Sequence, residues 1–257
     1  MTDTMIEFKN VTMSFGDKTI LEDLSFSVYK GETLAVIGPS GTGKSTVLRL
    51  IIGLLTPVQG KVLIKGQDVS TFKEDEWNQL RQDMGMVFQY SALFDFLTVG
   101  ENVAFGLRQH TEKTNDEIKA IVAARLAEVG LPHLENSWPA ELSGGMKKRV
   151  GLARATALQP EIMLYDEPTA GLDPIMSENI NDLIKETKKR MRVTSILVTH
   201  DMNSVLAVAD RVLLLYDKKI AAIGTLEEIK NNTHPILQKF LKTQTNLSNE
   251  ERGKVEK

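Results

Sequence analysis

The sequence predicts an α/β protein with a mainly parallel core sheet, an N-terminal antiparallel β subdomain and a helical subdomain. Three observations predict this class. Apolar runs of strand length recur from residue 34 onward and are mostly separated by helical patterns, which is typical of a parallel sheet covered by helices. Residues 5 to 30 alternate apolar and polar side chains, as half-buried antiparallel strands do. Residues 97 to 158 have helical character and no clear strand.

The strands are expected in two groups. Residues 5 to 30 predict short antiparallel strands joined by a turn at Gly16-Asp17-Lys18, because glycine and aspartate favour turns. The apolar runs that follow should form the largely parallel sheet. These runs cover residues 34–38, 62–66, 84–88, 162–166, 195–199 and 211–216.

Capping patterns mark the starts of three helices. Thr114 and Glu117 form a capping box, and Asp173 before a proline is typical of an N-cap. A second capping box occurs at Thr225 and Glu228.

Residues 1 to 244 are expected to form one domain, with a helical subdomain at about 97 to 158. A last helix is expected over 234 to 242, and the polar tail from 245 to 257 should be loose.

Composition excludes several classes of function. The chain has 257 residues, with 31 Lys and Arg against 34 Asp and Glu. This net charge of -3 argues against a nucleic-acid partner held by a strongly basic surface, although it leaves a local basic patch open. It contains no cysteine, so neither a disulfide framework nor a Cys-ligated zinc site can form. The longest apolar run, residues 48 to 55, is too short to span a bilayer, so we expect a soluble chain.

Residues 38 to 45 read Gly-Pro-Ser-Gly-Thr-Gly-Lys-Ser and match the phosphate-binding loop G-x-x-x-x-G-K-[ST] between a strand and a helix. The glycines allow backbone N–H groups to surround phosphates, a lysine adds a point charge, and a serine hydroxyl can ligate Mg²⁺. The alternative is a glycine turn that only caps a buried helix. The residues expected to hold ATP here are Gly38, Pro39, Ser40, Gly41, Thr42, Gly43, Lys44, Ser45 and Thr46.

Two acids and a histidine follow two other apolar strands. Asp166 and Glu167 end one strand, at the edge where ligands of parallel sheets bind, and a turn of ordinary loop residues is the alternative. Asp166 could hold Mg²⁺, while Glu167 could polarise a water for attack on the γ-phosphate. His200 ends another strand and could hydrogen-bond the γ-phosphate, or it could be a solvated residue before a helix.

The Ser-Gly-Gly turn in the stretch from Glu141 to Val150 lies far along the chain from the phosphate-binding loop. Ser143 is a natural N-cap, and Gly144 and Gly145 expose the N–H groups of a helix N-terminus, which favours an anion. An ordinary capped helix is the alternative.

Over about residues 5 to 230 these motifs, in this order, resemble the ATP-binding cassette (ABC) ATPases of the P-loop NTPase class. The resemblance implies that the turn is the signature motif, which binds the γ-phosphate of ATP held by a second copy, so two chains should form a homodimer. The trans-acting residues are then Leu142, Ser143, Gly144, Gly145 and Met146.

The resemblance implies further roles. Phe15 matches the aromatic residue that stacks on adenine, and Gln89 matches the glutamine that touches Mg²⁺ and the attacking water. Asp173 matches the loop that crosses the dimer. Taken together, the catalytic residues are expected to be Glu167, His200, Gln89 and Lys44, and the Mg²⁺ ligands Ser45, Gln89 and Asp166.

The family implies that the chain docks on integral membrane permease subunits, at the cytoplasmic face of the inner (plasma) membrane. Residues 90 to 97 read YSALFDFL, and these side chains predict either an apolar groove for a partner helix or core packing. Within the family, this stretch, the signature and Met146 are similar to the Mla-type phospholipid transport ATPases. That group works with MCE-domain lipid-binding subunits, and a small regulatory subunit is a further expected partner.

The sequence leaves alternative functions open. One is an ABC importer for a polar solute such as amino acids, and another is a soluble ABC ATPase that acts on DNA or ribosomes. The latter usually has long coiled-coil insertions or two cassettes in one chain, and this sequence shows neither. A nucleotide-sensing module without catalysis is disfavoured because Lys44, Asp166, Glu167 and His200 are all present.

Overall fold

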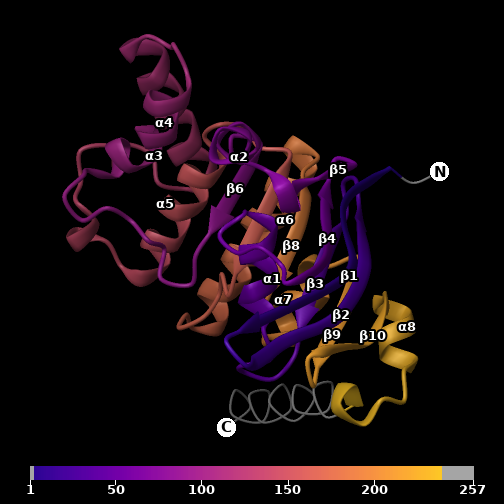
Figure 1. The fold of residues 1–257 in the computed structure, drawn as a ribbon. Coiled ribbons are helices and arrows are strands. Elements are labelled where there is room, and N and C mark those ends of the chain that lie inside the picture. Colours follow the sequence, from indigo (N-terminus) through magenta and orange to yellow (C-terminus); the bar gives the residue numbers. More distant parts are fainter. Residues whose placement is uncertain (1–2, 239–257) are drawn as a thin grey trace, which may run out of the picture.

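The computed structural model describes residues 3–238, and its ribbon separates into a two-sheet body and a helical lobe (Figure 1). The lobe contains α3 (Val99–His110), α4 (Asn115–Glu128) and α5 (Gly144–Thr156). It lies on the left of Figure 1, away from the antiparallel strands on the right. The predicted α/β class with an antiparallel part, a mainly parallel core and a helical part is confirmed.

The antiparallel sheet has four strands in the order β2-β1-β4-β5. Its first two strands are each 12 residues long, so the prediction of short strands was wrong in length. The turn at Gly16-Asp17 joins them as predicted, and Phe8 stacks on Phe26 across the pair at 4.5 Å between ring centroids. The strands are β1 (Thr4–Phe15), β2 (Lys18–Tyr29), β4 (Gln59–Ile64) and β5 (Gln67–Asp68).

The second sheet has six strands in the order β10-β9-β3-β8-β7-β6, and all neighbours are parallel except the edge strand β10. Alternate residues of β3 face opposite layers, so Leu34 and Val36 enter one hydrophobic cluster while Ala35 and Ile37 enter another. The strands are β3 (Thr33–Ile37), β6 (Met84–Val87), β7 (Ile162–Asp166), β8 (Thr194–Val198), β9 (Arg211–Tyr216) and β10 (Lys219–Thr225).

The predicted placement of residues 62–66 in the parallel sheet is wrong. These residues overlap β4, which pairs antiparallel with β1 through Ile64 opposite Ile6. Strands β3 and β8 are buried at every position, whereas the exposed residues and the alternation of β4 are typical of a strand with one wet face. The strands β5 and β10 were not predicted.

The remaining helices form layers on the sheets. Residues of α1 and α2 share one hydrophobic cluster with both sheets. Residues of α6 belong to a second cluster, together with the helical lobe and the opposite face of the parallel sheet. Helices α7 and α8 cover β3 and β9. Their bounds are α1 (Lys44–Ile51), α2 (Glu74–Arg81), α6 (Pro174–Met191), α7 (Met202–Val208) and α8 (Leu226–Asn231), with short 3-10 helices at Val69–Thr71 and Pro139–Glu141.

The predicted helix starts are confirmed. The Thr114 and Thr225 capping boxes begin α4 and α8, and Asp173 caps α6. The predicted helix over 234–242 begins one residue later, at 235, and is helical to residue 238; residues 239–242, like the tail from 245, lie outside the described residues. Within residues 3–238 no helix combines the length and the apolar character that a bilayer crossing requires.

Candidate functional site

The strand order brings the candidate site residues to one edge of the parallel sheet. Strands β3, β8, β7 and β6 are consecutive neighbours, so the segments after their carboxyl ends lie next to one another. Gly38 follows β3, His200 follows β8, Glu167 follows β7 and Gln89 follows β6. This edge is where ligands of open α/β sheets bind.

The phosphate-binding loop has the backbone geometry that its glycines allow. Gly43 precedes α1 with φ of +94°, and no side chain caps the helix, so its first N–H groups are free to face an anion. At Gly38, with φ of +154°, an added Cβ would lie 2.2 Å from the carbonyl oxygen of Leu215. The glycine there is required by close packing against β9.

The ammonium of Lys44 is folded over this loop. Its Nζ donates to the carbonyl oxygens of Gly38 at 2.9 Å and Pro39 at 3.1 Å. Burial lowers the pKa of Lys44, and the charges of Glu167 and Asp166 partly offset this effect. The loop therefore places a cation beside two carboxylates at the sheet edge.

Ser45 and Asp166 meet across the site, with the Ser45 Oγ donating to Asp166 Oδ1 at 2.9 Å. Burial raises the pKa of Asp166, while the Ser45 hydrogen bond acts in the opposite direction. A hydroxyl and a carboxylate are the hard oxygen ligands that suit Mg²⁺, which commonly takes only one or two protein carboxylates together with phosphate and water. Residues 3–238 contain no group of three or more His, Cys, Asp or Glu that could hold a metal alone.

Glu167 and His200 are in direct contact. The His200 Nδ1 lies 2.9 Å and 3.0 Å from the two carboxylate oxygens of Glu167, and the Thr199 hydroxyl donates to the same carboxylate at 3.1 Å. The Glu167 side chain is 12% exposed and its backbone has φ of +49°. Such backbone strain in a non-glycine residue is common at functional sites. Thr199 was not predicted as a site residue.

Gln89 is exposed after β6, and its backbone carries a contact that the sequence analysis missed. Lys148 of α5 is 6% exposed, and its ammonium donates to the carbonyl oxygens of Gln89 at 2.5 Å and Glu167 at 3.2 Å. Burial lowers the pKa of Lys148, with Glu167 and Asp166 opposing this effect. Three consecutive basic residues, 147 to 149, look like a solvated face in the sequence, so nothing distinguished Lys148.

The Ser-Gly-Gly turn begins α5 in the helical lobe. Ser143 caps the helix by accepting a hydrogen bond from the Met146 N–H at 3.3 Å. Ser143 and Gly144 are exposed, while an added Cβ at Gly145 would lie 2.3 Å from Met176 Cε of α6. None of the hydrogen bonds found among residues 3–238 joins this turn to the phosphate-binding loop.

Four other predicted residues lie at the surface, at a helix cap or within the lobe. Phe15 ends β1 and is 48% exposed. Asp173 accepts from the Met176 N–H at 2.9 Å, so its capping role is confirmed. Leu142 is buried and Met146 partly buried in the lobe.

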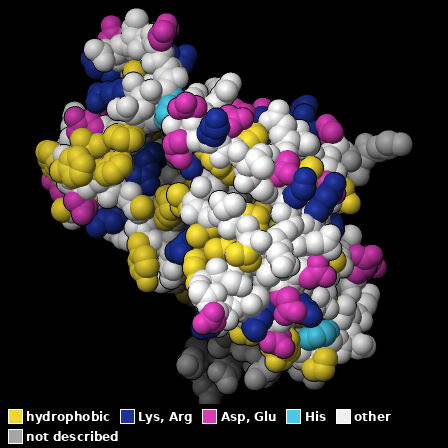
Figure 2. All heavy atoms as spheres, in the orientation of Figure 1, with side chains coloured by type: hydrophobic (Ala, Val, Ile, Leu, Met, Phe, Trp, Pro, Cys, Tyr) yellow, Lys and Arg dark blue, Asp and Glu magenta, His cyan; other side chains and the backbone are white. Residues whose placement is uncertain are grey.

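Exposed aromatic side chains lie on the lobe beside this site. Tyr90 is 86% and Phe96 is 76% exposed, so core packing does not describe these two residues. Phe94 contacts both Phe96 and Phe105 of α3, at 5.6 Å and 4.8 Å between ring centroids. We call Tyr90, Phe94, Phe96 and Phe105 the aromatic patch, and Figure 2 shows hydrophobic side chains gathered on the lobe.

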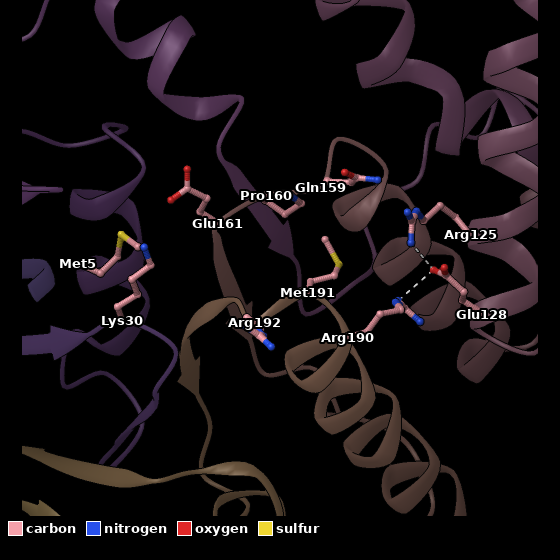
Figure 3. Close-up of a pocket in the computed structure, with 10 residues that line it drawn as sticks. All are labelled: Met5, Lys30, Arg125, Glu128, Gln159, Pro160, Glu161, Arg190, Met191 and Arg192. Carbon is pink, nitrogen blue, oxygen red and sulfur yellow. Dashed lines mark hydrogen bonds and ion pairs between the residues drawn. The ribbon is translucent and has the colours of Figure 1, made fainter. Parts of the chain in front are cut away.

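A cavity of about 550 Å³ lies apart from all these residues, near the start of β7 and the end of α6 (Figure 3). Its lining includes Glu128, which is paired with Arg125 at 2.5 Å and with Arg190 at 2.9 Å. None of the residues predicted for the ATP site lines this cavity. This cavity is therefore separate from the predicted ATP site, whereas another cavity, of about 580 Å³, is lined by Glu167 and His200.

The comparisons with known proteins agree with this geometry. A family model described as ABC transporter matches residues 21–170. The "Intermembrane phospholipid transport system ATP-binding protein MlaF" of Haemophilus influenzae is 42% identical over 94% of this chain and 92% of its own length. The "Probable ribonucleotide transport ATP-binding protein mkl" of Mycobacterium leprae is 41% identical over 92% of this chain and 68% of its own length.

A solved dimer of the ATP-binding cassette MJ0796, bound to ADP and Pi, matches with a TM-score of 0.80 and 33% identity. The match covers 86% of this chain and 99% of that one. Both the sequence and the fold therefore agree with an ATP-hydrolysing cassette. The chain belongs to the ABC transporter family, as one of its ATP-binding subunits.

Proposed function

We propose that two copies of this chain bind and hydrolyse Mg²⁺-ATP at a head-to-tail interface and thereby drive membrane permease subunits. The observation that carries the proposal is the cluster at the sheet edge. There Ser45 meets Asp166, His200 meets Glu167, and the ammonium of Lys44 is held on the neighbouring loop. A phosphate-binding loop, a carboxylate for the metal and a carboxylate for water are the parts that phosphoryl transfer to water requires.

The loop binds the phosphates of ATP. Lys44 exchanges its contacts with Gly38 and Pro39 for the β- and γ-phosphates, and the N–H groups at the start of α1 donate to the same oxygens. Ser45, Asp166 and Gln89 would hold Mg²⁺, which neutralises phosphate charge when bound. The exposed ring of Phe15 stacks on adenine.

Glu167 acts as the general base. Its carboxylate is mostly buried and its backbone is held by hydrogen bonds to Val198 and Lys148, so it can accept the proton of a water aligned with the γ-phosphate. His200 is 64% exposed, and its imidazole can turn from Glu167 toward the γ-phosphate. Gln89, at the end of the neighbouring strand, orients the same water.

The signature turn acts on the ATP of the other copy. Its exposed residues, Ser143 and Gly144, stand at a helix N-terminus that favours an anion, and Gly145 supports the turn by packing against Met176. Asp173, which caps the next helix, lies in the loop that faces the partner copy. The dimeric arrangement of the MJ0796 cassette supports this assignment.

The aromatic patch receives a helix of the membrane permease. Clusters of exposed aromatic side chains are more common at protein–protein interfaces than on the rest of a protein surface. The chain then sits at the cytoplasmic face of the inner (plasma) membrane. An MCE-domain lipid-binding subunit and a small regulatory subunit complete the proposed assembly.

We further propose that the cargo is phospholipid or another hydrophobic molecule. The MlaF relative is named for phospholipid transport and supports this choice. A polar solute is the second candidate, because the mkl relative carries the name of a ribonucleotide transporter. Isolation of the complex followed by mass spectrometry of bound small molecules separates the two, and a bound polar solute other than ATP or ADP, found without lipid, would exclude the first.

Replacement of the proposed base tests the catalytic part. Glu167→Gln should leave ATP affinity within about 2-fold and lower phosphate release about 100-fold or more. It should also trap an ATP-bound dimer, visible by analytical ultracentrifugation. Glu186→Gln, at an exposed position of α6, is the matched control and should behave like the parent. Undiminished hydrolysis by Glu167→Gln would remove the assigned role.

A further inference from the structure

Lys148 connects three parts of the molecule through one buried ammonium. It belongs to α5, five residues after Ser143, and donates to the carbonyl oxygens of Gln89 and Glu167. Gln89 and Glu167 follow the adjacent strands β6 and β7. The side chain therefore joins the signature helix to both backbone segments that carry the proposed water-orienting residue and the proposed base.

Burying the charged side chain of Lys148 between a helix and a sheet costs more free energy than burying an apolar one. Val150 and Leu152 of the same helix make this contact with apolar side chains. Removing an ammonium from water is unfavourable unless it regains hydrogen bonds, and the two carbonyl oxygens supply them. An ammonium has three donors and no acceptor, so it can hold two carbonyl groups at fixed distances at once.

The same helix also holds the segment between Gln89 and the aromatic patch. Arg154 donates to the carbonyl oxygens of Ser91 at 2.9 Å and Ala92 at 2.7 Å, and its guanidinium lies 5.8 Å from the centre of the Phe94 ring. Ser91 and Ala92 both have positive φ, at 60° and 46°. Residues 89–94 thus lie on α5 with Lys148 at one end and Arg154 at the other.

We propose that Lys148 is a positioning residue that couples the aromatic patch and the signature helix to the placement of Glu167. A displacement of residues 89–94 by a docked partner is transmitted through the shared ammonium to the peptide of Glu167 and to the N-terminal half of α5. The proposed base and the signature turn then move together. This inference rests on the proposed ATPase function, and it adds that Lys148 links the partner-docking segment to the proposed base and the signature turn.

The test compares full-length variants of Lys148. Lys148→Met keeps the length of the side chain without donors and should lower kcat about 10-fold or more while ATP affinity changes less than about 2-fold. Lys148→Arg retains donors and should recover most of the lost rate. Lys119→Met removes an exposed lysine of α4 and serves as the control for losing a charge from the lobe. A purely structural contact would instead lower kcat and ATP affinity together.

Hydrogen exchange supplies a readout that does not need activity. Lys148→Met should raise exchange in residues 86–96 and in residues 164–172 together, whereas Lys119→Met should change neither. Normal kcat in Lys148→Met, or faster exchange in only one of these segments, would overturn the coupling. If Lys148→Met does not fold, Lys148→Gln replaces it in both measurements. The Gln side chain is polar but too short to reach both carbonyl groups, so the same loss of kcat and the same rise in exchange are expected. ATP hydrolysis by the parent and its loss in Glu167→Gln would support the proposed ATPase function independently. In that case, a Lys148→Met variant with normal kcat would contradict the coupling and not the ATPase function.

Discussion

Glu167 shows how a strained residue is kept in place by its neighbours. Its N–H donates to the carbonyl oxygen of Val198 at 2.8 Å, while its own carbonyl oxygen accepts from Lys148. Its carboxylate is held by Thr199 and His200. With the peptide groups and the side chain all bound, the left-handed backbone persists although it costs about 1 to 3 kcal/mol.

Gly43 gives a test of the phosphate-binding loop at the same scale. Gly43→Ala should lower the free energy of unfolding by about 2 kcal/mol or more, because φ is +94° and the added Cβ would lie 2.7 Å from Leu21 Cδ2. ATP affinity should fall as the loop shifts. The control is Gly16→Ala, at φ of +56° with nothing within 4 Å, which should cost only about 1 kcal/mol. Urea unfolding measures both, and equal losses would contradict the role of the close contact.

At the scale of elements, one buried side chain of α3 organises the segment that carries the aromatic patch. Asn102 is fully buried and its side chain accepts from the Phe94 N–H at 2.8 Å. Its NH₂ group, which has two N–H donors, faces the carbonyl oxygens of Phe94 at 3.0 Å, Leu97 at 3.2 Å and Thr98 at 3.0 Å. The loop therefore takes its shape from the helix that follows it.

Asn102→Ala should lower the free energy of unfolding by about 2 to 4 kcal/mol, since it leaves buried backbone groups without partners. Hydrogen exchange should rise over residues 94–98 before any other part of the lobe. Gln109→Ala, at an exposed position of the same helix, should stay within about 0.5 kcal/mol of the parent. A stability loss in Asn102→Ala without local exchange in that loop would count against this account.

The start of α4 predicts a pH effect. The backbone N–H of Thr114, and then its hydroxyl, lower the pKa of Glu117 below its ordinary value of 4.5. Because the folded pKa is the lower one, the stabilisation is present above pH 4.5 and is lost as the pH falls through the folded value. NMR titration of the Glu117 carboxyl should give a pKa below 4.5 in the parent, and the pKa should be lowered less in Thr114→Ala. A Glu117 pKa at or above 4.5 in folded parent protein would contradict the capping box.

The parts of the structure that short sequence patterns determine were predicted well. The phosphate-binding loop, the acids after β7 and the N-caps Ser143 and Asp173 each follow from residue types at fixed spacing. The pairing of β4 with β1 was missed because an apolar run predicts a strand but does not indicate which sheet that strand joins. Lys148 was missed for a similar reason, since its two carbonyl partners lie 59 and 19 residues away along the chain.

At the scale of the whole molecule, the two halves of the proposed catalytic machinery occupy different parts of the fold. The phosphate-binding loop, the acids and His200 lie at the edge of the parallel sheet, while the signature turn begins a helix of the lobe. Hydrogen bonds of Lys148 and Arg154 join the lobe to the loop after β6. In the proposed function, such a chain completes a pocket by presenting its signature turn to another copy.

Mixed dimers test this claim most directly. Lys44→Ala should disable the phosphate-binding loop and Ser143→Arg the signature turn, so each variant alone should release almost no phosphate. In a head-to-tail pair of the two variants, one pocket combines the intact loop of one chain with the intact turn of the other. An equal mixture should therefore regain about a quarter of the parent rate, because about half of the dimers carry one working pocket of two. A mixture that forms mixed dimers but stays inactive would contradict the shared pocket.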